Sequence, residues 1–115
     1  MIKIDNLGSE ALQNVRISLD DLSVVELTMR FLPATQKWSY DLVYGEFISK
    51  GNILCTHANI LRRFRKNLPF GLACLTSDGT EPFMIDDFVT GRVSLYILNA
   101  DDVDYVEESI IGAAA

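Results

Sequence analysis

The chain has 115 residues, of which 49% are apolar and 23% charged, and its formal net charge is −6 at pH 7. These values are those of one ordinary globular domain, large enough to form a core without disulfides or a metal. The acidic balance argues against general binding to nucleic acid or to an anionic membrane, because such binding depends on an excess of cationic side chains.

The sequence also indicates in which compartment the protein is expected to fold. The chain has no apolar run near the roughly 20 residues of a membrane span, and its first residues lack the pattern of a secretory signal. We therefore expect assembly in the cytoplasm, with no membrane partner. Cys55 and Cys74 have no metal-ligand spacing, and we expect both to be buried and reduced.

The first segments in chain order read as strands. Ile2 and Ile4 flank Lys3 in a possible short edge strand, and residues 14–19 alternate apolar with polar side chains. Alternation with a period of two is typical of a half-buried strand.

Residues 24–44 form the centre of the predicted fold. Two alternating runs are joined there by a polar turn at 33–37, as expected for an antiparallel hairpin. Trp38, Tyr40 and Tyr44 share one face of the second run, so this hairpin should supply the heaviest part of the core.

The next residues should return the chain along the hairpin. Gly45-Glu46 reads as a tight turn, and a strand follows from Phe47. Residues 49–52 are a further turn or a bulge, and extended structure resumes over 53–55.

Two interpretations remain open for residues 56–70. Ile60, Leu61, Phe64 and Leu68 have helical spacing, which predicts a short helix. The alternative is a loop followed by a short strand at 61–65, and we favour it because the flanking segments read as strands.

The last third contains two further strands. Residues 72–75 form a short, fully apolar strand, residues 81–91 an irregular acidic connection, and residues 92–98 an alternating strand. Residues 100–115, acidic and then alanine-rich, should be a flexible tail. The whole predicts a single mainly β domain over 1–115, with its core at about 13–99. Its form should be a small antiparallel β-barrel or sandwich with short turns and at most one short helix.

A basic cluster is the most uneven feature of the sequence. It places four of the ten cationic residues within five positions: Arg62, Arg63, Phe64, Arg65 and Lys66. Arginines beside an aromatic residue suit contact with a phosphate, a carboxylate cluster or a partner chain. The other interpretation is a solvated stretch that offsets the acidic remainder.

The acidic groups have no pattern of a metal site. Asp86 and Asp87, and the later Asp101, Asp102 and Asp104, lack the spacing of a calcium loop, so they read as turn formers or as partners for a neighbouring subunit's basic cluster. Cys55 and His57 have no recognisable third residue to complete a catalytic group. We expect no enzyme activity, no cofactor and no metal.

The order of these segments resembles the baseplate plug family of contractile-tailed bacteriophages. The resemblance rests on the hairpin VELTMRFLPATQKWSYDLVY, the run ILRRFRKNLPFG and the closing DDFVTGRVSLYIL, and covers about residues 13–99. The matching positions are Leu61, Arg62, Arg63, Phe64, Arg65, Pro69, Gly71, Asp87, Gly91, Arg92 and Leu95. The chain departs from the family pattern in its longer 54–60 passage and its shorter turn at Gly45.

The resemblance implies a non-enzymatic virion protein near the axis of the tail baseplate, assembled in the host cytoplasm. Such a plug or adaptor would join the tail tube or hub to the central spike, and would form a homo-oligomer such as a trimer or hexamer ring. Its interface would involve the basic cluster with Asp86 and Asp87. The alternative function is a small β-barrel module that binds single-stranded nucleic acid or oligosaccharide through the same arginines.

Overall fold

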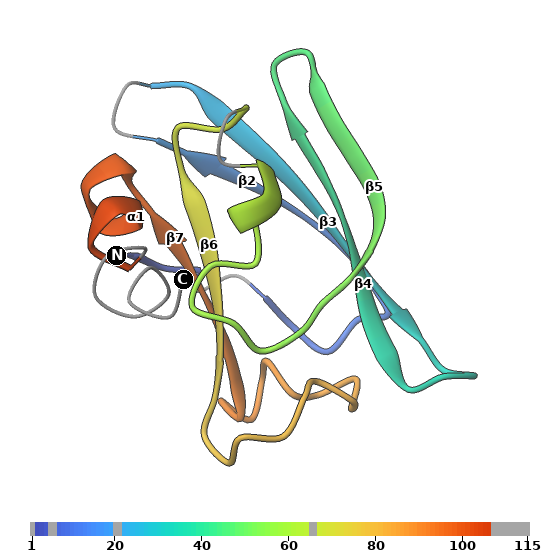
Figure 1. The fold of residues 1–115 in the computed structure, drawn as a ribbon. Coiled ribbons are helices and arrows are strands. Elements are labelled where there is room, and N and C mark those ends of the chain that lie inside the picture. Colours follow the sequence, from blue (N-terminus) through green and yellow to red (C-terminus); the bar gives the residue numbers. More distant parts are fainter. Residues whose placement is uncertain (1, 5–6, 20–21, 65–66, 107–115) are drawn as a thin grey trace.

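The computed structural model describes residues 2–4, 7–19, 22–64 and 67–106, and of Arg63 only the backbone. Two antiparallel sheets face each other (Figure 1). The four-stranded sheet has the order β2 (Leu12–Ser18), β3 (Val24–Leu32), β4 (Lys37–Tyr44) and β5 (Phe47–Ile53). The three-stranded sheet has the order β1 (Ile2–Lys3), β7 (Val93–Leu98) and β6 (Gly71–Thr76).

The predicted central hairpin is confirmed. β3 and β4 pair in antiparallel register with Met29 opposite Tyr40 and Phe31 opposite Trp38. The alternating apolar side chains point inward, and Trp38 is completely buried. Its ring packs against Phe31 and Phe88 at centroid distances of 5.3 and 5.0 Å.

The core lies between the two sheets. Side chains from both inner faces form one buried cluster, in which Leu27 and Leu42 come from the larger sheet and Leu72 and Leu95 from the smaller. No strand pairing joins the two sheets within the described ranges. The prediction of a mainly β barrel or sandwich is therefore confirmed in its sandwich form.

Of the two alternatives for residues 49–52, a turn or a bulge, the structure has the bulge. Tyr40 pairs with Asn52 and Leu42 with Ser49, so β5 carries one extra residue opposite β4. Gly51 adopts a φ of +70° there, which favours glycine, and its N–H donates to Asp41 Oδ1 at 2.8 Å. This bulge ends in the Asn52–Ile53 stretch that borders the surface described below.

The prediction of a flexible tail over residues 100–115 is wrong for its first residues, 100–106. Residues Ala100–Val106 form α1, which contributes Val103 and Val106 to a second buried cluster with Ala73 and Leu98. α1 therefore covers the outer face of β6 and β7, which explains why β6 is apolar on both faces. Residues 107–115 lie outside the described residues.

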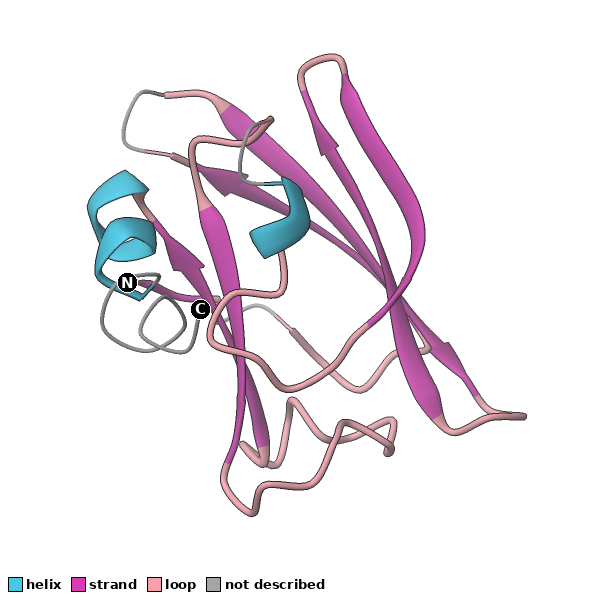
Figure 2. Ribbon diagram, in the orientation of Figure 1, coloured by secondary structure: helices cyan, strands magenta, loops and turns pink. Residues whose placement is uncertain are grey.

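The strand favoured at 61–65 is not formed. The described part of this stretch contains a short 3₁₀ helix, η1 (Arg62–Phe64) (Figure 2). An isolated bridge between His57 and Cys74 precedes it. Ile60 N–H donates to Leu72 O at 2.8 Å, so the segment is held to β6 without a strand of its own.

The expectation for the cysteines holds for Cys74 and is wrong for Cys55. Cys74 is buried in the core, whereas Cys55 is exposed. Cys55 follows the end of β5, where the chain leaves the larger sheet and turns across the surface. The helices within the described ranges are too short to cross a membrane.

Candidate protein–protein interface

An ion pair organises the connection between β6 and β7. Arg92 Nε lies 2.9 Å from Asp87 Oδ1, and Arg92 Nη2 lies 2.7 Å from Asp87 Oδ2. Asp87 is 1% exposed, so this two-point contact is buried on the carboxylate side. The N–H groups of Phe83 and Met84 also donate to Asp87 Oδ2, each at 2.8 Å. One carboxylate thus joins the middle of an irregular loop to its end.

The Arg92 guanidinium also ties down the beginning of the loop. It donates to Asp78 Oδ1, to Thr80 O and to Glu81 O, each at 3.0 Å. Its Cζ atom lies 4.6 Å from the centre of the Phe83 ring. Residues 78–92 therefore form a pre-ordered loop, although they contain no regular secondary structure.

We call Arg92 and its partners Asp78 and Asp87 the clamp. Each of these groups stabilises the charged form of the groups that it contacts. Desolvation alone would raise the pKa of the Asp87 carboxyl, but the Arg92 hydrogen bonds and the two backbone donors outweigh it, and the pKa lies below its ordinary value. The backbone hydrogen bond from Thr80 and the contact with Arg92 likewise lower the pKa of Asp78. The hydrogen bonds to Asp87 raise the pKa of Arg92. At neutral pH all three groups are charged.

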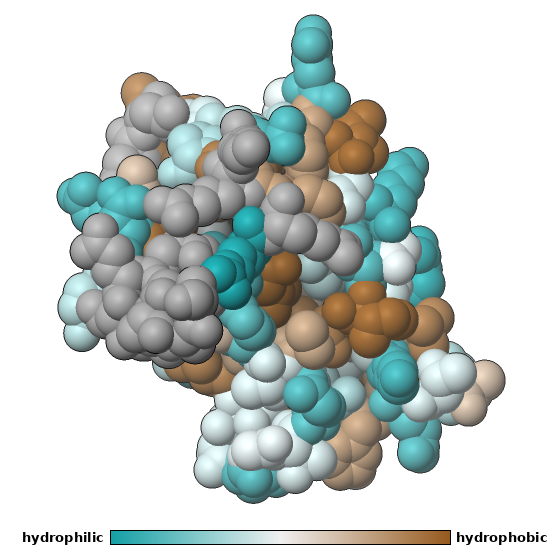
Figure 3. Space-filling model, in the orientation of Figure 1, coloured by the Kyte–Doolittle hydropathy of each residue, from teal (hydrophilic) through white to brown (hydrophobic). Residues whose placement is uncertain are grey.

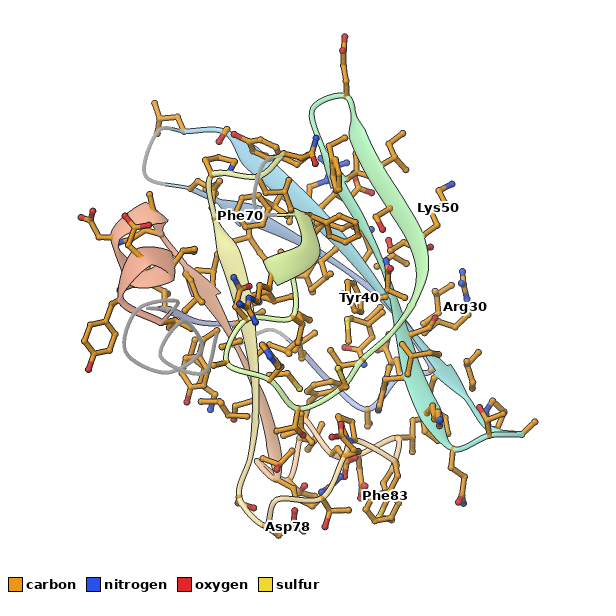
Figure 4. All side chains as sticks on the ribbon, viewed as in Figure 1. Arg30, Tyr40, Lys50, Phe70, Asp78 and Phe83 are labelled. Carbon is orange, nitrogen blue, oxygen red and sulfur yellow. The ribbon has the colours of Figure 1, made fainter. Side chains whose placement is uncertain are left out.

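The clamped loop presents apolar side chains to solvent. Phe83, Met84 and Ile85 are 38%, 47% and 39% exposed, and Val89 is 60% exposed. We call residues 83–85 the apolar tip. Phe83 lies at the lower end of the molecule, near Asp78, in Figure 4. Several large apolar side chains exposed on one ordered loop are typical of a contact surface.

The apolar tip is attached to the larger sheet. Trp38 Nε1 donates to Met84 O at 3.0 Å, and the Phe88 ring packs on the Trp38 indole. The tip therefore has a fixed position relative to both sheets.

The basic cluster lies on and after η1. Arg62 is exposed, and Phe64 is half-buried with its ring 5.2 Å from the Phe47 ring. Leu61 is buried in the core and anchors the segment. The Arg63 side chain and all of Arg65 and Lys66 lie outside the described residues. Within the described part, Phe64 is a packing residue that attaches the cluster to β5.

Asn59 holds the segment before η1 in place. Its Oδ1 accepts hydrogen bonds from Leu61 N–H at 3.1 Å and from Leu72 N–H at 3.2 Å. Its own N–H donates to His57 Nδ1 at 2.9 Å. Asn59 is buried, and glycine is needed at position 71 because a Cβ there would lie 2.7 Å from Asn59 Oδ1.

An open groove of about 710 Å³ separates the edge of β5 from this segment. Its lining combines apolar and polar side chains, with Arg62 at one end: Tyr40, Gly51, Asn52, Ile53, Cys55, His57, Asn59, Ile60 and Arg62. Figure 3 looks onto this side of the molecule and shows apolar surface gathered near its centre.

The structure separates the two acidic residues predicted at an interface. Asp86 is half-buried on the loop, beside the apolar tip. The suggestion that Asp87 meets a neighbouring subunit's cation is wrong, because its carboxylate is buried and bound to Arg92. Sequence analysis missed this pairing because Arg92 was read only as a strand residue, although both residues belong to the family pattern.

The described ranges contain no group of three or more His, Cys, Asp or Glu side chains placed to hold a metal ion. What the described residues do present is a two-sheet scaffold with an ordered apolar loop, a groove and an exposed arginine. These features define a small, mainly β two-sheet domain.

Comparison with known families identifies the chain more closely. Residues 1–101 match the family described as cyanophage baseplate Pam3 plug gp18. The match spans most of the chain, so the protein belongs to this baseplate plug family, and the resemblance found in the sequence is confirmed. No curated protein matches the chain.

Proposed function

We propose that the chain is a plug or adaptor near the axis of a phage tail baseplate, where it joins the tail tube or hub to the central spike. The observation that carries this proposal is the match of residues 1–101 to a baseplate plug family. Family membership supports a structural role in the phage baseplate, in contact with other baseplate proteins. The specific position between tube and spike is our proposal.

The function proposed is contact and shape, without catalysis. The clamped β6–β7 loop supports it, because Arg92 holds the apolar tip in one conformation before any partner binds. A pre-ordered loop loses little conformational entropy on association. The basic cluster, residues 62–66, supplies a second contact through arginines that can pair with carboxylates of a neighbouring protein.

The test is a phage in which the gene for this chain is silenced. We expect particles without a closed tail tip, and loss of infectivity that is restored by wild-type protein supplied in trans. Normal, infectious particles made without the protein would overturn the proposal.

Complementation also tests the basic cluster. An Arg63→Glu, Arg65→Glu variant should fold but fail to restore infectivity, whereas Lys37→Glu, Lys50→Glu, the same charge change on β4 and β5, should restore it. Full rescue by the double variant would show that the cluster is not a contact.

A further inference from the structure

We propose that the outer edge of β2 accepts an extended segment of a different baseplate protein as a fifth strand of the larger sheet. The apolar side chains of that segment alternate with carboxylates. This rests on the proposed role of the chain as a structural component in contact with other baseplate proteins, and it names one contact surface and the chemistry of its partner.

Three of the four edge strands in the described ranges are protected against pairing with another chain. β1 has only two residues, and the segment 57–60 covers the edge of β6 through backbone hydrogen bonds. β5 carries the bulge with Gly51, and Lys50 is exposed beside it. Short strands, covering segments, bulges and lysines are the usual means by which proteins prevent edge-to-edge association.

β2, the fourth edge, lacks these protecting features and is the outermost strand of the larger sheet (Figure 1). Its residues Leu12–Ser18 include no lysine, proline or glycine, and they pair with β3 in one unbroken register. Ala11 O accepts from Phe31 N–H at 2.7 Å, and Leu19 N–H donates to Ser23 O at 2.8 Å, so the odd-numbered residues face β3. The N–H and C=O groups of the even-numbered residues therefore point to the open side, where they form a template for another strand.

A hollow beside this edge indicates which side chains the added strand would carry. It has a volume of about 270 Å³ and lies where β2 meets β1 of the smaller sheet. Ile2, Ile17 and Ile97 supply apolar lining, and Ile2 is 63% exposed. Side chains of the added strand that lie beside Ile17 would enter the hollow and cover Ile2, so apolar residues are favoured at those positions.

The charges at the same place favour an acidic partner. Lys3 and Arg16 also line the hollow, and both are exposed. Glu26 lies opposite Arg16 in the register and accepts a hydrogen bond from Asn14 at 3.0 Å, so its charge is shared with a second donor. A carboxylate beside Arg16 on the other side would add a cross-strand attraction. The positions of the added strand that share the face of Arg16 are therefore assigned to Asp or Glu.

A second copy of this chain fits the edge less well. Its own β2 would bring another Arg16 to the contact in place of a carboxylate, and like charges on neighbouring strands are destabilising. Each copy also has a net charge of −6, which opposes association of two copies. The occupant we assign is therefore a different protein.

Removal of one outward N–H provides the first test, in silenced phage that receive wild type and variant in equal amounts. Asn14→Pro should fold, because the lost N–H faces away from β3, but the tails should contain about 10-fold less of it than of the wild type. Asn14→Ala is the matched control, since it loses the side-chain hydrogen bonds to Glu26 and Thr28 but keeps the N–H. It should enter tails as the wild type does.

Ile53→Pro is the control at the opposite edge. Leu54 N–H bonds to Trp38 O, so the neighbouring Ile53 N–H points away from β4. Removing it should leave incorporation unchanged, whereas an equal loss in Asn14→Pro and Ile53→Pro would mean that proline acts through folding.

Charge reversal tests the same edge without a proline. Lys3→Glu, Arg16→Glu should enter tails about 10-fold less than the wild type, since it opposes like charges on the added strand. Lys37→Glu, Lys50→Glu makes the same charge change on β4 and β5 and should enter tails normally.

A photoreactive benzophenone amino acid at position 12, which is exposed on β2, identifies the occupant in intact tails. Irradiation should join the chain to another baseplate protein, at a segment in which apolar and acidic residues alternate. Cross-links only between copies of this chain, or normal incorporation of folded Asn14→Pro or of the β2-edge charge variant, would each overturn the proposal. Such a result would leave the plug role intact if silenced phage still lose their tail tips; a dispensable protein would instead remove that role whatever the edge binds.

Discussion

The Asp87 carboxylate and the Arg92 guanidinium, only five positions apart in the sequence, meet along two parallel hydrogen bonds of 2.9 and 2.7 Å. Side chains this close in sequence usually cannot order a longer segment. Here they do, because the remaining Arg92 donors reach back to Asp78, Thr80 and Glu81. The exposed apolar tip depends on this clamp for its conformation.

Removing the charge of Asp87 should release the loop. Asp87→Asn leaves Arg92 without its main partner, and breaking a buried pair in this way costs about 3–5 kcal/mol of unfolding free energy. We expect a value at the lower end, because Arg92 keeps its contacts with Asp78 and two carbonyls. Urea unfolding measures the loss, and amide exchange should rise over residues 78–91. Asp41→Asn, on the outer face of the larger sheet, is the control; equal losses in the two variants would contradict the clamp.

Low pH should lower the unfolding free energy of the protein by protonating the Asp87 carboxylate. The folded pKa of Asp87 lies below its ordinary value, so its contribution to stability is fully present above the unfolded pKa of about 3.9 and is lost as pH falls through the folded pKa. Unfolding free energy measured between pH 7 and pH 2 should therefore fall in the acidic part of the range. The fall should be smaller in Asp87→Asn. Identical pH profiles of the two proteins would mean that Asp87 gains nothing from Arg92.

Trp38 should report the position of the apolar tip. The indole is completely buried, so its fluorescence maximum should lie well to the blue of that of exposed tryptophan. Trp38→Phe removes the donor to Met84 O and should cost at least about 1–3 kcal/mol, the penalty for a buried acceptor left unsatisfied. The comparison is Tyr44→Phe, which loses only a half-buried hydroxyl contact with Ser23 and should cost less. Emission typical of exposed tryptophan would contradict the burial.

Gly71 should tolerate no larger residue. A Cβ at this position would lie 2.7 Å from Asn59 Oδ1, which already accepts from Leu61 and Leu72. Gly71→Ala should therefore destabilise by about 1–3 kcal/mol, as is usual for overpacking. In Gly8→Ala the nearest atom to the new Cβ is 3.9 Å away, so this variant should be nearly neutral. Thermal unfolding provides the test: Gly71→Ala should melt at a lower temperature than Gly8→Ala. Equal melting temperatures would contradict the close contact at Gly71.

The two thiols should differ sharply in reactivity. Desolvation, with the nearby Cys55 as a second cause, raises the pKa of the Cys74 thiol to about 12, and Cys74 is fully buried. Cys55 is exposed. A thiol reagent at neutral pH should label one cysteine per native chain rapidly, and both after unfolding in urea. Rapid labelling of Cys55→Ser at its remaining thiol would contradict the burial of Cys74.

The strands could be predicted from the sequence because their signal is local. Alternation with a period of two is encoded in neighbouring residues, and it placed Trp38 inside and the β3–β4 turn correctly. The helix α1 was missed because its seven residues bury only two apolar side chains. A signal was available: Asn99 Oδ1 accepts from Asp102 N–H at 2.8 Å, and Asp102 Oδ2 accepts from Asn99 N–H at 3.3 Å. This reciprocal pair is a form of capping box, with Asn and Asp at its two positions.

The interface could be predicted only in part, because it is assembled by tertiary structure. Arg62 was found from the charge density of its segment and from the family resemblance, and in the structure it is exposed. Asp87 was read as a turn former or as a partner for a neighbouring subunit's basic cluster, and only the fold buries it and brings Arg92 onto it. The apolar tip was not singled out in the sequence, where residues 81–91 read as an irregular acidic connection; the clamp is what turns Phe83 and Met84 outward.

The most direct measurement for the central claim, that this chain is a structural part of a phage tail baseplate, is electron cryomicroscopy of intact tails from the phage that encodes it. We expect density on the tail axis, between tube and spike, that fits the two sheets and the clamped β6–β7 loop. Tails with no such density at the baseplate would contradict it.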